Sequence, residues 1–274
     1  MAAMHDAPYA TRHALAAIAW RSGRPAPGDE CVAEERAVAL EVNGIAHAVM
    51  LATPADLEDF ALGFCLTEGL IDSASDLLDA ESAPAGEDGV ALRLTVTQRC
   101  LARFKERRRS LAGRTGCGLC GTESIEEALR PVRRDGARPG VTAGALALGM
   151  RALGGDALVL QRATGATHAA AWIRLDGTLA LVREDVGRHN ALDKLVGAMA
   201  RAGTDPAGGF VAVTSRASHE MVQKTAAAGA GILAAISAPT ALAVRTARRG
   251  GLVLVGFARD DRATVYAGTE RVAA

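Results

Sequence analysis

The 274-residue sequence predicts an α/β protein, α+β overall, with a small N-terminal unit and a larger C-terminal unit built on a mixed sheet with helices on both faces. The first observation is that helical and apolar strand patterns alternate after residue 187, which is typical of a sheet with parallel strands. The second is a pair of hairpin signals, Asn43-Gly44 and Asp176-Gly177, each between two strand-like runs. The chain is also long enough to bury a substantial core.

Residues 1–30 are expected to be a mobile leader, because Pro25, Pro27 and nearby glycines and serines interrupt any regular pattern. Residues 31–113 are expected to form a ββαβα unit. Thr53-Pro54 has the pattern of a helix N-cap, and Gly69 that of a C-terminal stop. The expected elements are strands 38–42 and 45–51, a helix before Gly69, a polar flexible stretch over 73–89, a strand over 90–96 and a basic helix over about 98–111.

A second domain is expected over residues 124–274, after a cysteine loop at 114–123. Ser124 to Glu127 has the capping-box pattern of a helix start. A loop is expected over 131–140. The later elements are a helix over 142–153, strands 172–175 and 178–182, a helix over 188–200, a strand over 210–214, a helix over 218–228, a strand over 231–236, a helix over 240–248 and a strand over 252–257.

The composition excludes several function classes. The 31 basic and 31 acidic side chains cancel, which argues against a general nucleic-acid or membrane-surface binder. No run approaches the roughly 18 apolar residues of a membrane span, and the N-terminus lacks the pattern of a secretory signal. Five cysteines are an odd number in such a chain and favour a reducing compartment. We therefore expect a cytoplasmic protein that contacts neither nucleic acid nor membrane.

Cys117 and Cys120 form a Cys-x-x-Cys pair within the glycine-rich segment 114–123, and they are the candidate catalytic residues. Two such thiols can share a metal, close a disulfide or carry a sulfur atom. Arg114 and the helix expected after the pair favour the thiolate form. Zinc is disfavoured because a closed site needs four ligands, and because a zinc deaminase needs a His-x-Glu upstream that this chain lacks. A thioredoxin-type redox pair remains an alternative, as do two buried structural cysteines.

Three polar clusters follow predicted strands, where open α/β sheets bind ligands. They are Arg183 to Asn190, which contains His189; Thr214 to Glu220, which contains Arg216; and Phe257 to Arg262. Arginines at strand exits and a helix N-terminus favour phosphate. Each cluster has a plainer interpretation as a capped or solvated loop, and a lone histidine is more often a structural group than a base. The basic run 105–109 is expected to be a solvated face or a dock for an acidic partner near the thiols.

Six segments together resemble the FdhD family, the formate dehydrogenase accessory sulfurtransferases also called sulfur carrier proteins FdhD. The similarity extends in order from about residue 30 to the C-terminus. The segments are 56–64, 114–121, 164–170, 183–194, 215–224 and 256–266.

The resemblance implies a sulfur relay from a cysteine desulfurase to a molybdenum (or tungsten) bis(molybdopterin guanine dinucleotide) cofactor, which then enters formate dehydrogenase. By position, it implies that Cys117 carries the persulfide with Cys120 as its helper. It also implies that Phe257, Ala258, Arg259, Asp260, Asp261 and Arg262 bind the cofactor, a purpose that Arg216 and His189 would share. A C-terminal domain similar to cytidine deaminase but without its zinc, no intrinsic metal and a homodimer are further expectations. The rival function is a non-catalytic chaperone for the same cofactor.

Overall fold

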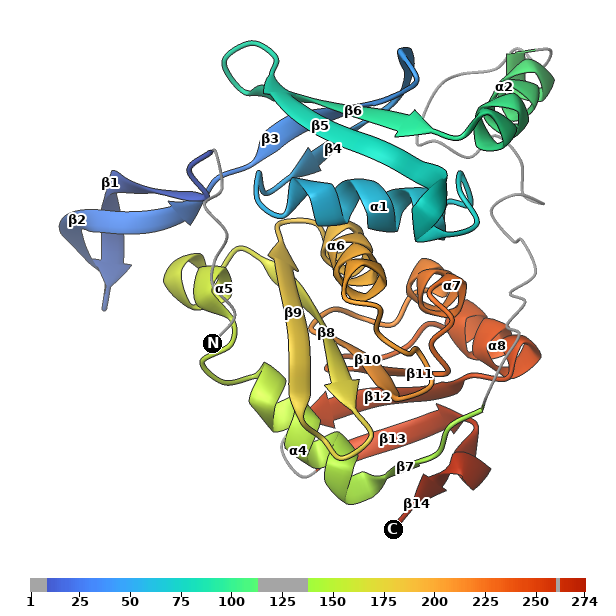
Figure 1. The fold of residues 1–274 in the computed structure, drawn as a ribbon. Helices are drawn as coiled ribbons and strands as arrows, with labels where there is room; N and C mark the ends of the chain where they lie inside the picture. The colour runs from blue at the N-terminus through green and yellow to red at the C-terminus, as the bar shows by residue number, and fades with distance from the viewer. Residues whose placement is uncertain (1–8, 113–137, 260–261) are drawn as a thin grey trace.

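The computed structural model describes residues 9–112, 138–259 and 262–274, and it is a mixed α/β protein as the sequence predicts (Figure 1). A four-stranded sheet with the order β4-β3-β6-β5 forms the N-terminal part, and a six-stranded sheet with the order β13-β12-β11-β10-β8-β9 forms the C-terminal part. The N-terminal elements are β3 (Arg36–Val42), β4 (Ile45–Ala52), α1 (Leu57–Thr67), η1 (Ala74–Asp76), β5 (Leu77–Pro84), β6 (Gly89–Val96) and α2 (Gln98–Ala112).

The six-stranded sheet is mixed, because β10, β11 and β12 are parallel while β8, β9 and β13 run antiparallel to their neighbours. The remaining elements are β7 (Val141–Thr142), α4 (Ala143–Leu153), α5 (Val159–Thr164), β8 (His168–Arg174), β9 (Leu179–Asp185), α6 (Arg188–Arg201), β10 (Gly209–Val213), α7 (His219–Ala227), β11 (Ile232–Ala235), α8 (Ala241–Gly250), β12 (Val253–Arg259), β13 (Arg262–Ala267), η2 (Thr269–Arg271) and β14 (Val272–Ala273).

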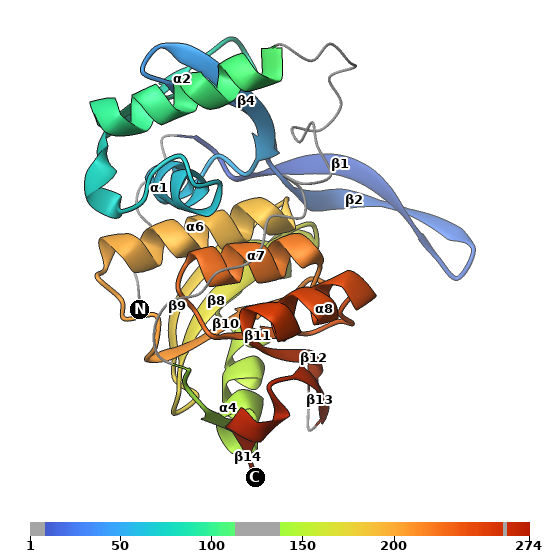
Figure 2. The same ribbon diagram turned by 90° about the vertical axis from the view of Figure 1, so that its right-hand side faces the viewer.

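Helices cover both faces of this sheet, as predicted. Alternate strand residues point to opposite faces, and each face has its own apolar core. Trp172, Val211 and Leu233 pack with α6, α7 and α8, whereas Ile173 and Phe210 pack with α4 on the other face. Figure 2 shows α6, α7 and α8 stacked above the strands and α4 below them.

The N-terminal part rests on the C-terminal part through a close crossing of α1 and α6. A Cβ atom on Gly63 would lie 1.7 Å from the Asp193 carbonyl oxygen, and one on Gly197 would lie 1.9 Å from that of Asp59. Only glycine permits two helix backbones to approach so closely. Both glycines therefore fix how the two sheets are placed relative to each other.

The leader predicted over residues 1–30 instead contains a long β-hairpin. Strand β1 (Arg12–Arg21) pairs antiparallel with β2 (Arg24–Ala33), and Ser22 and Gly23 form the turn with positive φ angles of 50° and 78°. The prediction was wrong because prolines on an edge strand leave a two-stranded ladder intact where their missing N–H faces outward. Residues 1–8 lie outside the described residues.

Two smaller predictions were also wrong. The stretch predicted as flexible, 73–89, contains η1 and the edge strand β5, which pairs with β6. Thr53 is not the N-cap of α1. Asp56 occupies that position with φ 52°, while the Thr53 backbone N–H donates to Asp185 across the domain contact. The hairpin at Asn43-Gly44 and the helices near 98–111, 142–153, 188–200, 218–228 and 240–248 are confirmed.

Candidate functional site

The carboxyl ends of β10, β11 and β12 meet at one edge of the six-stranded sheet, which we call the strand-end edge. It consists of segments 186–189, 214–218, 236–240 and 256–259. Backbone hydrogen bonds join the last three of these segments: Ala217 N–H donates to the Ala238 carbonyl at 3.3 Å, and Phe257 N–H donates to the Ser237 carbonyl at 3.2 Å. On the other side, Thr214 N–H donates to Ala169 at 3.0 Å. The structure thus brings three predicted clusters to one place.

Three helices begin at this edge. The N-caps of α6, α7 and α8 are Gly187, Ser218 and Thr240, and the two hydroxyl side chains accept backbone N–H groups of the first turn. A helix N-terminus carries partial positive charge and free N–H donors. Three of them beside one sheet edge create a positive potential that suits an anionic ligand.

Side chains at the edge add to this potential. Arg216 is exposed; its backbone carbonyl accepts a hydrogen bond from the Ser215 hydroxyl, but its guanidinium has no hydrogen bond or ion pair among the described residues. His189 Nε2 on α6 lies 2.7 Å from the Glu220 carboxylate on α7, and this close contact, against the opposing effect of burial, holds the pKa of Glu220 below its usual range. Burial lowers the pKa of His168, and the nearby Arg188 lowers it further. Arg216 is therefore a cation available to a ligand, whereas His189 is already paired.

The Phe257–Arg262 segment forms the end of the β12–β13 hairpin. Phe257 has φ 51°, a left-handed conformation that is costly for a bulky residue and that often marks a functional position. Arg259 and Arg262 pair across the ladder, and the Arg262 guanidinium lies 5.3 Å from the centre of the Phe257 ring. Asp260 and Asp261, two of the predicted binding residues, lie outside the described residues.

A cavity of about 230 Å³ lies beneath this hairpin. Both arginines border it, and its other walls are small or apolar: Ala143, Leu146, Ala147, Met150, Ala258, Ala263, Val265 and Val272. Buried Ala258, one of the predicted residues, is part of the wall. Two cations at the mouth of an apolar cavity can bind a group that is apolar at one end and anionic at the other.

Several residues of the cluster Arg183 to Asn190 hold neighbouring elements together. The sequence alone did not distinguish this structural role from ligand binding. Arg183 donates to the buried Asp59 of α1 at 2.7 and 2.9 Å, and the Glu184 carboxylate accepts the first backbone N–H groups of α5. Asp185 pairs with Lys194 at 2.6 Å, and both side chains are fully buried. Only the last residues of this cluster therefore remain near the strand-end edge.

A second buried ion pair joins α1, α6 and α7. Lys224 Nζ lies 2.9 Å from Asp193 and 2.8 Å from Glu68, and it donates to the Thr67 hydroxyl. These partners lie up to 157 positions apart in the sequence, so no local pattern could have paired them. In the sequence, the signal that could have indicated a buried ion pair was the presence of charged residues on the inward face of α6.

Cys117 and Cys120 lie outside the described residues, as do Arg114 and the capping-box segment after them. In the chain they lie between α2 and β7. The start of α2 is held firmly: Arg99 contacts the Asp76 carboxylate at 3.0 and 3.1 Å, and Arg103 contacts Asp72 at 3.0 Å. The helix that precedes the cysteine segment is thus anchored to the N-terminal sheet.

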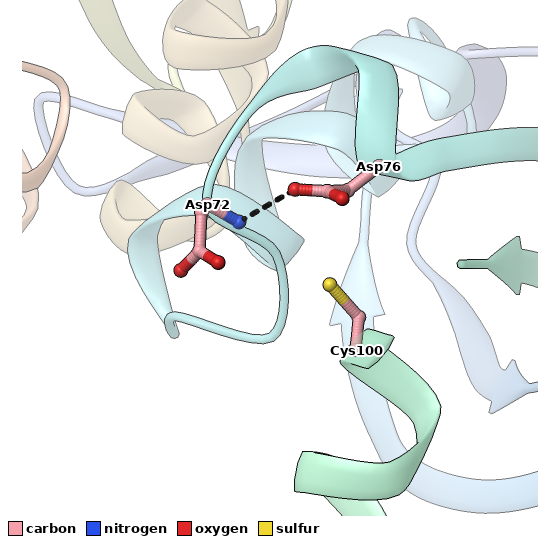
Figure 3. A group of neighbouring side chains, drawn as sticks. All are labelled: Asp72, Asp76 and Cys100. Atoms are coloured by element: carbon pink, nitrogen blue, oxygen red, sulfur yellow. Dashed lines mark hydrogen bonds between the residues drawn. The ribbon is translucent and has the colours of Figure 1, made fainter. Parts of the chain in front are cut away.

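Asp72, Asp76 and Cys100 offer ligand atoms within 4.8 Å of one another, the arrangement drawn in Figure 3. A metal would have to displace Arg99 and Arg103, which already neutralise both carboxylates. The hydrogen bond from Arg99 lowers the pKa of Asp76, although burial acts the other way. The group is therefore better explained as the anchor of α2 than as a metal site.

Among the described cysteines, Cys65 and Cys100 are fully buried and Cys31 is half-buried. Burial, together with the Asp193 charge and Cys100, raises the pKa of the Cys65 thiol to about 12. A thiol attacks as its thiolate, so Cys65 is unsuited to carry sulfur. Two of these three thiols therefore belong to the core.

Comparison with known proteins assigns the family. The FdhD/NarQ family model matches residues 33–273. The chain belongs to the FdhD/NarQ family. A sulfur carrier protein FdhD from Cupriavidus necator is 55% identical over 276 residues, covering 99% of this chain and 93% of that protein. One from Bordetella petrii is 53% identical over 271 residues, covering 98% and 97%.

The fold of this FdhD/NarQ protein is similar to that of a solved structure. A formate dehydrogenase accessory protein from Desulfotalea psychrophila superimposes with a TM-score of 0.76 at 25% identity, covering 96% of this chain and all of that one. In the described part of the chain, no helix has both the length and the apolar character needed to cross a membrane.

Proposed function

We propose that this protein is a sulfur carrier that serves formate dehydrogenase in the cytoplasm. In this role it accepts sulfur from a cysteine desulfurase on Cys117 and delivers it to the molybdenum bis(molybdopterin guanine dinucleotide) cofactor. The cofactor is the acceptor substrate and is not a resident group of the protein. The family, and relatives that are named sulfur carrier proteins, support this proposal.

The observation that carries the proposal is that segments far apart in the chain, the one with Arg216 and the one with Phe257, both bond to the 236–240 segment at the strand-end edge, with the Arg262 guanidinium beside the Phe257 ring. Guanine dinucleotides carry phosphate charges, which arginine forks and helix N-termini bind well. The cavity under the β12–β13 hairpin offers an apolar wall beside Arg259 and Arg262. A large anionic cofactor therefore has both charge and shape to match.

The sulfur step is a displacement at sulfur. The Cys117 thiolate attacks the outer sulfur of the desulfurase persulfide, the S–S bond of that persulfide breaks, and the desulfurase cysteine leaves as its thiolate. A persulfide on Cys117 is the product, and no oxidant is consumed. Cys120 assists by sharing or resolving this persulfide. In the resolving step the Cys120 thiolate attacks the inner sulfur on Cys117, a Cys117–Cys120 disulfide forms, and the outer sulfur leaves as hydrosulfide for the metal of the bound cofactor; a cellular thiol reductant then restores both thiols.

Binding of GDP, the smallest fragment with both guanine and phosphates, tests the cofactor half of the proposal. We expect Arg259→Ala and Arg262→Ala each to weaken GDP binding by about tenfold, as the loss of one charge-assisted contact to phosphate predicts. Arg162→Ala on α5 is the matched control, because its ion pair with Asp156 is exposed. Equal affinity in all four proteins would contradict the assignment of this hairpin.

Formate dehydrogenase activity in cells that carry Cys117→Ala or Cys120→Ala tests the sulfur half. A carrier requires Cys117, so the Cys117→Ala cells lose activity while the purified variant still binds GDP. The alternative function, a non-catalytic chaperone for the same cofactor, predicts that activity survives both substitutions. The FdhD resemblance further leads us to propose a homodimer and a C-terminal domain related to cytidine deaminase without its zinc.

A further inference from the structure

Helix α8 presents a row of arginines to solvent. Its exposed residues recur at helical spacing, so they lie on one side of the helix. They are Ala241, Arg245, Arg248 and Arg249, and no residue of α8 is acidic. The helix packs against α7, β12 and β13, and in Figure 2 it is the outermost of the three helices on its face of the sheet. The side of α8 that faces away from these contacts is therefore cationic.

A fourth arginine reaches this side of α8 from another part of the chain. Gly251 is the C-cap of α8, and a Cβ atom on it would lie 3.2 Å from the guanidinium carbon of Arg138. Arg138 is an exposed residue, so its charge adds to those of the helix at the C-terminal end. We call the group Arg138, Arg245, Arg248 and Arg249 the arginine row.

The arginine row has no acidic partner among the described residues. The Arg248 guanidinium donates to the neutral backbone carbonyl of Tyr266 at 3.2 and 3.3 Å. In the part of the chain that the structure describes, the guanidinium groups of the other three members have no hydrogen bond or ion pair. Four positive charges therefore lie together without a countercharge, in a chain whose basic and acidic residues balance overall.

Stabilisation of the helix end explains only part of the row. Cations in the last turn of a helix interact favourably with its dipole, and Arg248 and Arg249 hold that position. Arg245 lies in the middle of α8, beyond the range of this effect. Because Arg245 and Arg249 are like charges four positions apart, their repulsion opposes helix formation. An anion from outside the chain would remove this repulsion.

The surroundings of the row favour an acidic protein segment over other polyanions. α8 exposes no large apolar side chain that could enter a lipid surface. It has no aromatic residue on which a base could stack, and the chain has no net charge to attract a nucleic-acid backbone. Carboxylates, in contrast, pair with guanidinium groups through two parallel hydrogen bonds.

We propose that the arginine row of α8 docks an acidic segment of a partner protein. Arg245 and Arg249 are about 6 Å apart along the helix axis, at 1.5 Å per residue. Acidic residues at alternate positions of an extended segment are about 7 Å apart, so two of them can pair with both arginines. The row lies in the second half of α8, whereas the strand-end edge contains its N-cap Thr240. This docking surface is therefore separate from the proposed cofactor site and does not depend on the sulfur chemistry.

Fluorescence anisotropy of a labelled decaglutamate peptide with the full chain, at physiological ionic strength, tests the proposal. We expect the wild type to bind and the double variant Arg245→Glu/Arg249→Glu to bind about tenfold more weakly or worse, because two charge-assisted contacts are lost. Arg12→Glu/Arg24→Glu is the matched control. It makes the same change in net charge on the exposed β1–β2 hairpin, which lies on the opposite side of the molecule from α8 (Figure 1). Its affinity should change by less than about twofold, since distant charges are screened.

A wild type that does not bind the peptide, or an equal loss of affinity in the two double variants, would overturn the proposed docking surface. Tighter binding of a labelled single-stranded oligonucleotide with the same number of charges would overturn the choice of a protein partner.

The position of the bound peptide gives a second readout that does not rely on substitution. A benzophenone group on the peptide should cross-link to residues 241–251, and excess GDP should leave peptide binding unchanged. Cross-links confined to the β12–β13 hairpin, or release of the peptide by GDP, would contradict the α8 surface, because Arg259 and Arg262 are another pair of exposed arginines. GDP binding by Arg245→Glu/Arg249→Glu at the wild-type affinity would show that this variant is folded and that the two sites fail independently.

Discussion

The buried Asp185–Lys194 pair gives a sharp test of how the two parts of the molecule are held together. We expect Lys194→Met to lower the free energy of unfolding by about 3 kcal/mol, because it leaves a buried carboxylate without its countercharge. Lys194 Nζ lies 2.6 Å from Asp185 and donates at 2.8 Å to the Thr53 carbonyl, in the turn before α1. Methionine preserves most of the side-chain volume, so the loss of charge is the main change.

The magnitude follows from what Asp185 retains. Three neutral donors remain on its carboxylate: the backbone N–H groups of Thr53 and Gly187 and the Asn190 amide, at 2.8 to 3.1 Å. They place the cost at the lower end of the 3 to 5 kcal/mol expected when one partner of a buried ion pair is removed. A loss of this size is a large fraction of the roughly 5 to 15 kcal/mol that stabilises a typical domain.

Urea denaturation followed by circular dichroism measures this change. Arg162→Met, which removes the exposed pair with Asp156, is the control and should change stability little. Adding Asp185→Asn to Lys194→Met removes the uncompensated charge and should recover part of the loss. The reasoning would be refuted if Lys194→Met were as stable as the control, or if the second substitution made the protein less stable still.

The remaining predictions concern the helix crossing, a histidine and the anchor of α2. Gly197→Ala should lower the free energy of unfolding by about 3 kcal/mol or more, because its Cβ would lie only 1.9 Å from a backbone carbonyl oxygen. In the same urea titration Gly144→Ala, whose Cβ would meet one atom at 3.9 Å, should leave the stability nearly unchanged. Burial lowers the pKa of His168, so as the pH drops through about 6.5 the unfolded chain binds the proton before the folded chain does, and the free energy of unfolding should fall. His168→Gln should flatten this dependence of stability on pH. A pH dependence that the substitution leaves unchanged would contradict the assignment to His168. Asp76→Asn should speed amide hydrogen exchange in the first turn of α2 more than Asp79→Asn does, because the Asp76 carboxylate binds Arg99 of that turn. Equal exchange rates in the two variants would contradict the role of Asp76 in anchoring α2.

The sequence predicted the elements whose signals are local. Asn43-Gly44 adopts the two positive φ angles of a tight hairpin turn, and Thr142, Ser218 and Thr240 mark the starts of helices. Alternating apolar runs predicted the strands of the C-terminal sheet and the helices that cover it. These features depend on neighbouring residues, which a linear pattern records well.

Long-range pairing explains what the sequence could not predict. Thr53 has the pattern of an N-cap, but its backbone pairs with Asp185, 132 positions away. The prolines of β2 indicated a loop because the edge position that tolerates them is set by the ladder. The strand-end edge was predicted as three separate polar clusters, and only the sheet order places them together. Arg183 and Asp185 belong to a predicted polar cluster, but their ion pairs with Asp59 and Lys194 could not be seen in the motif because those partners lie elsewhere in the fold.

Transfer of labelled sulfur tests the central claim most directly. The full chain is incubated with a cysteine desulfurase and ³⁵S-cysteine, and protein-bound label is measured without reductant and after it. We predict reductant-sensitive label on the wild type and on Cys100→Ser, whose thiol is buried, and its loss from Cys117→Ala. Label that is equally strong in Cys117→Ala, or absent from a wild type that still binds GDP, would contradict the account.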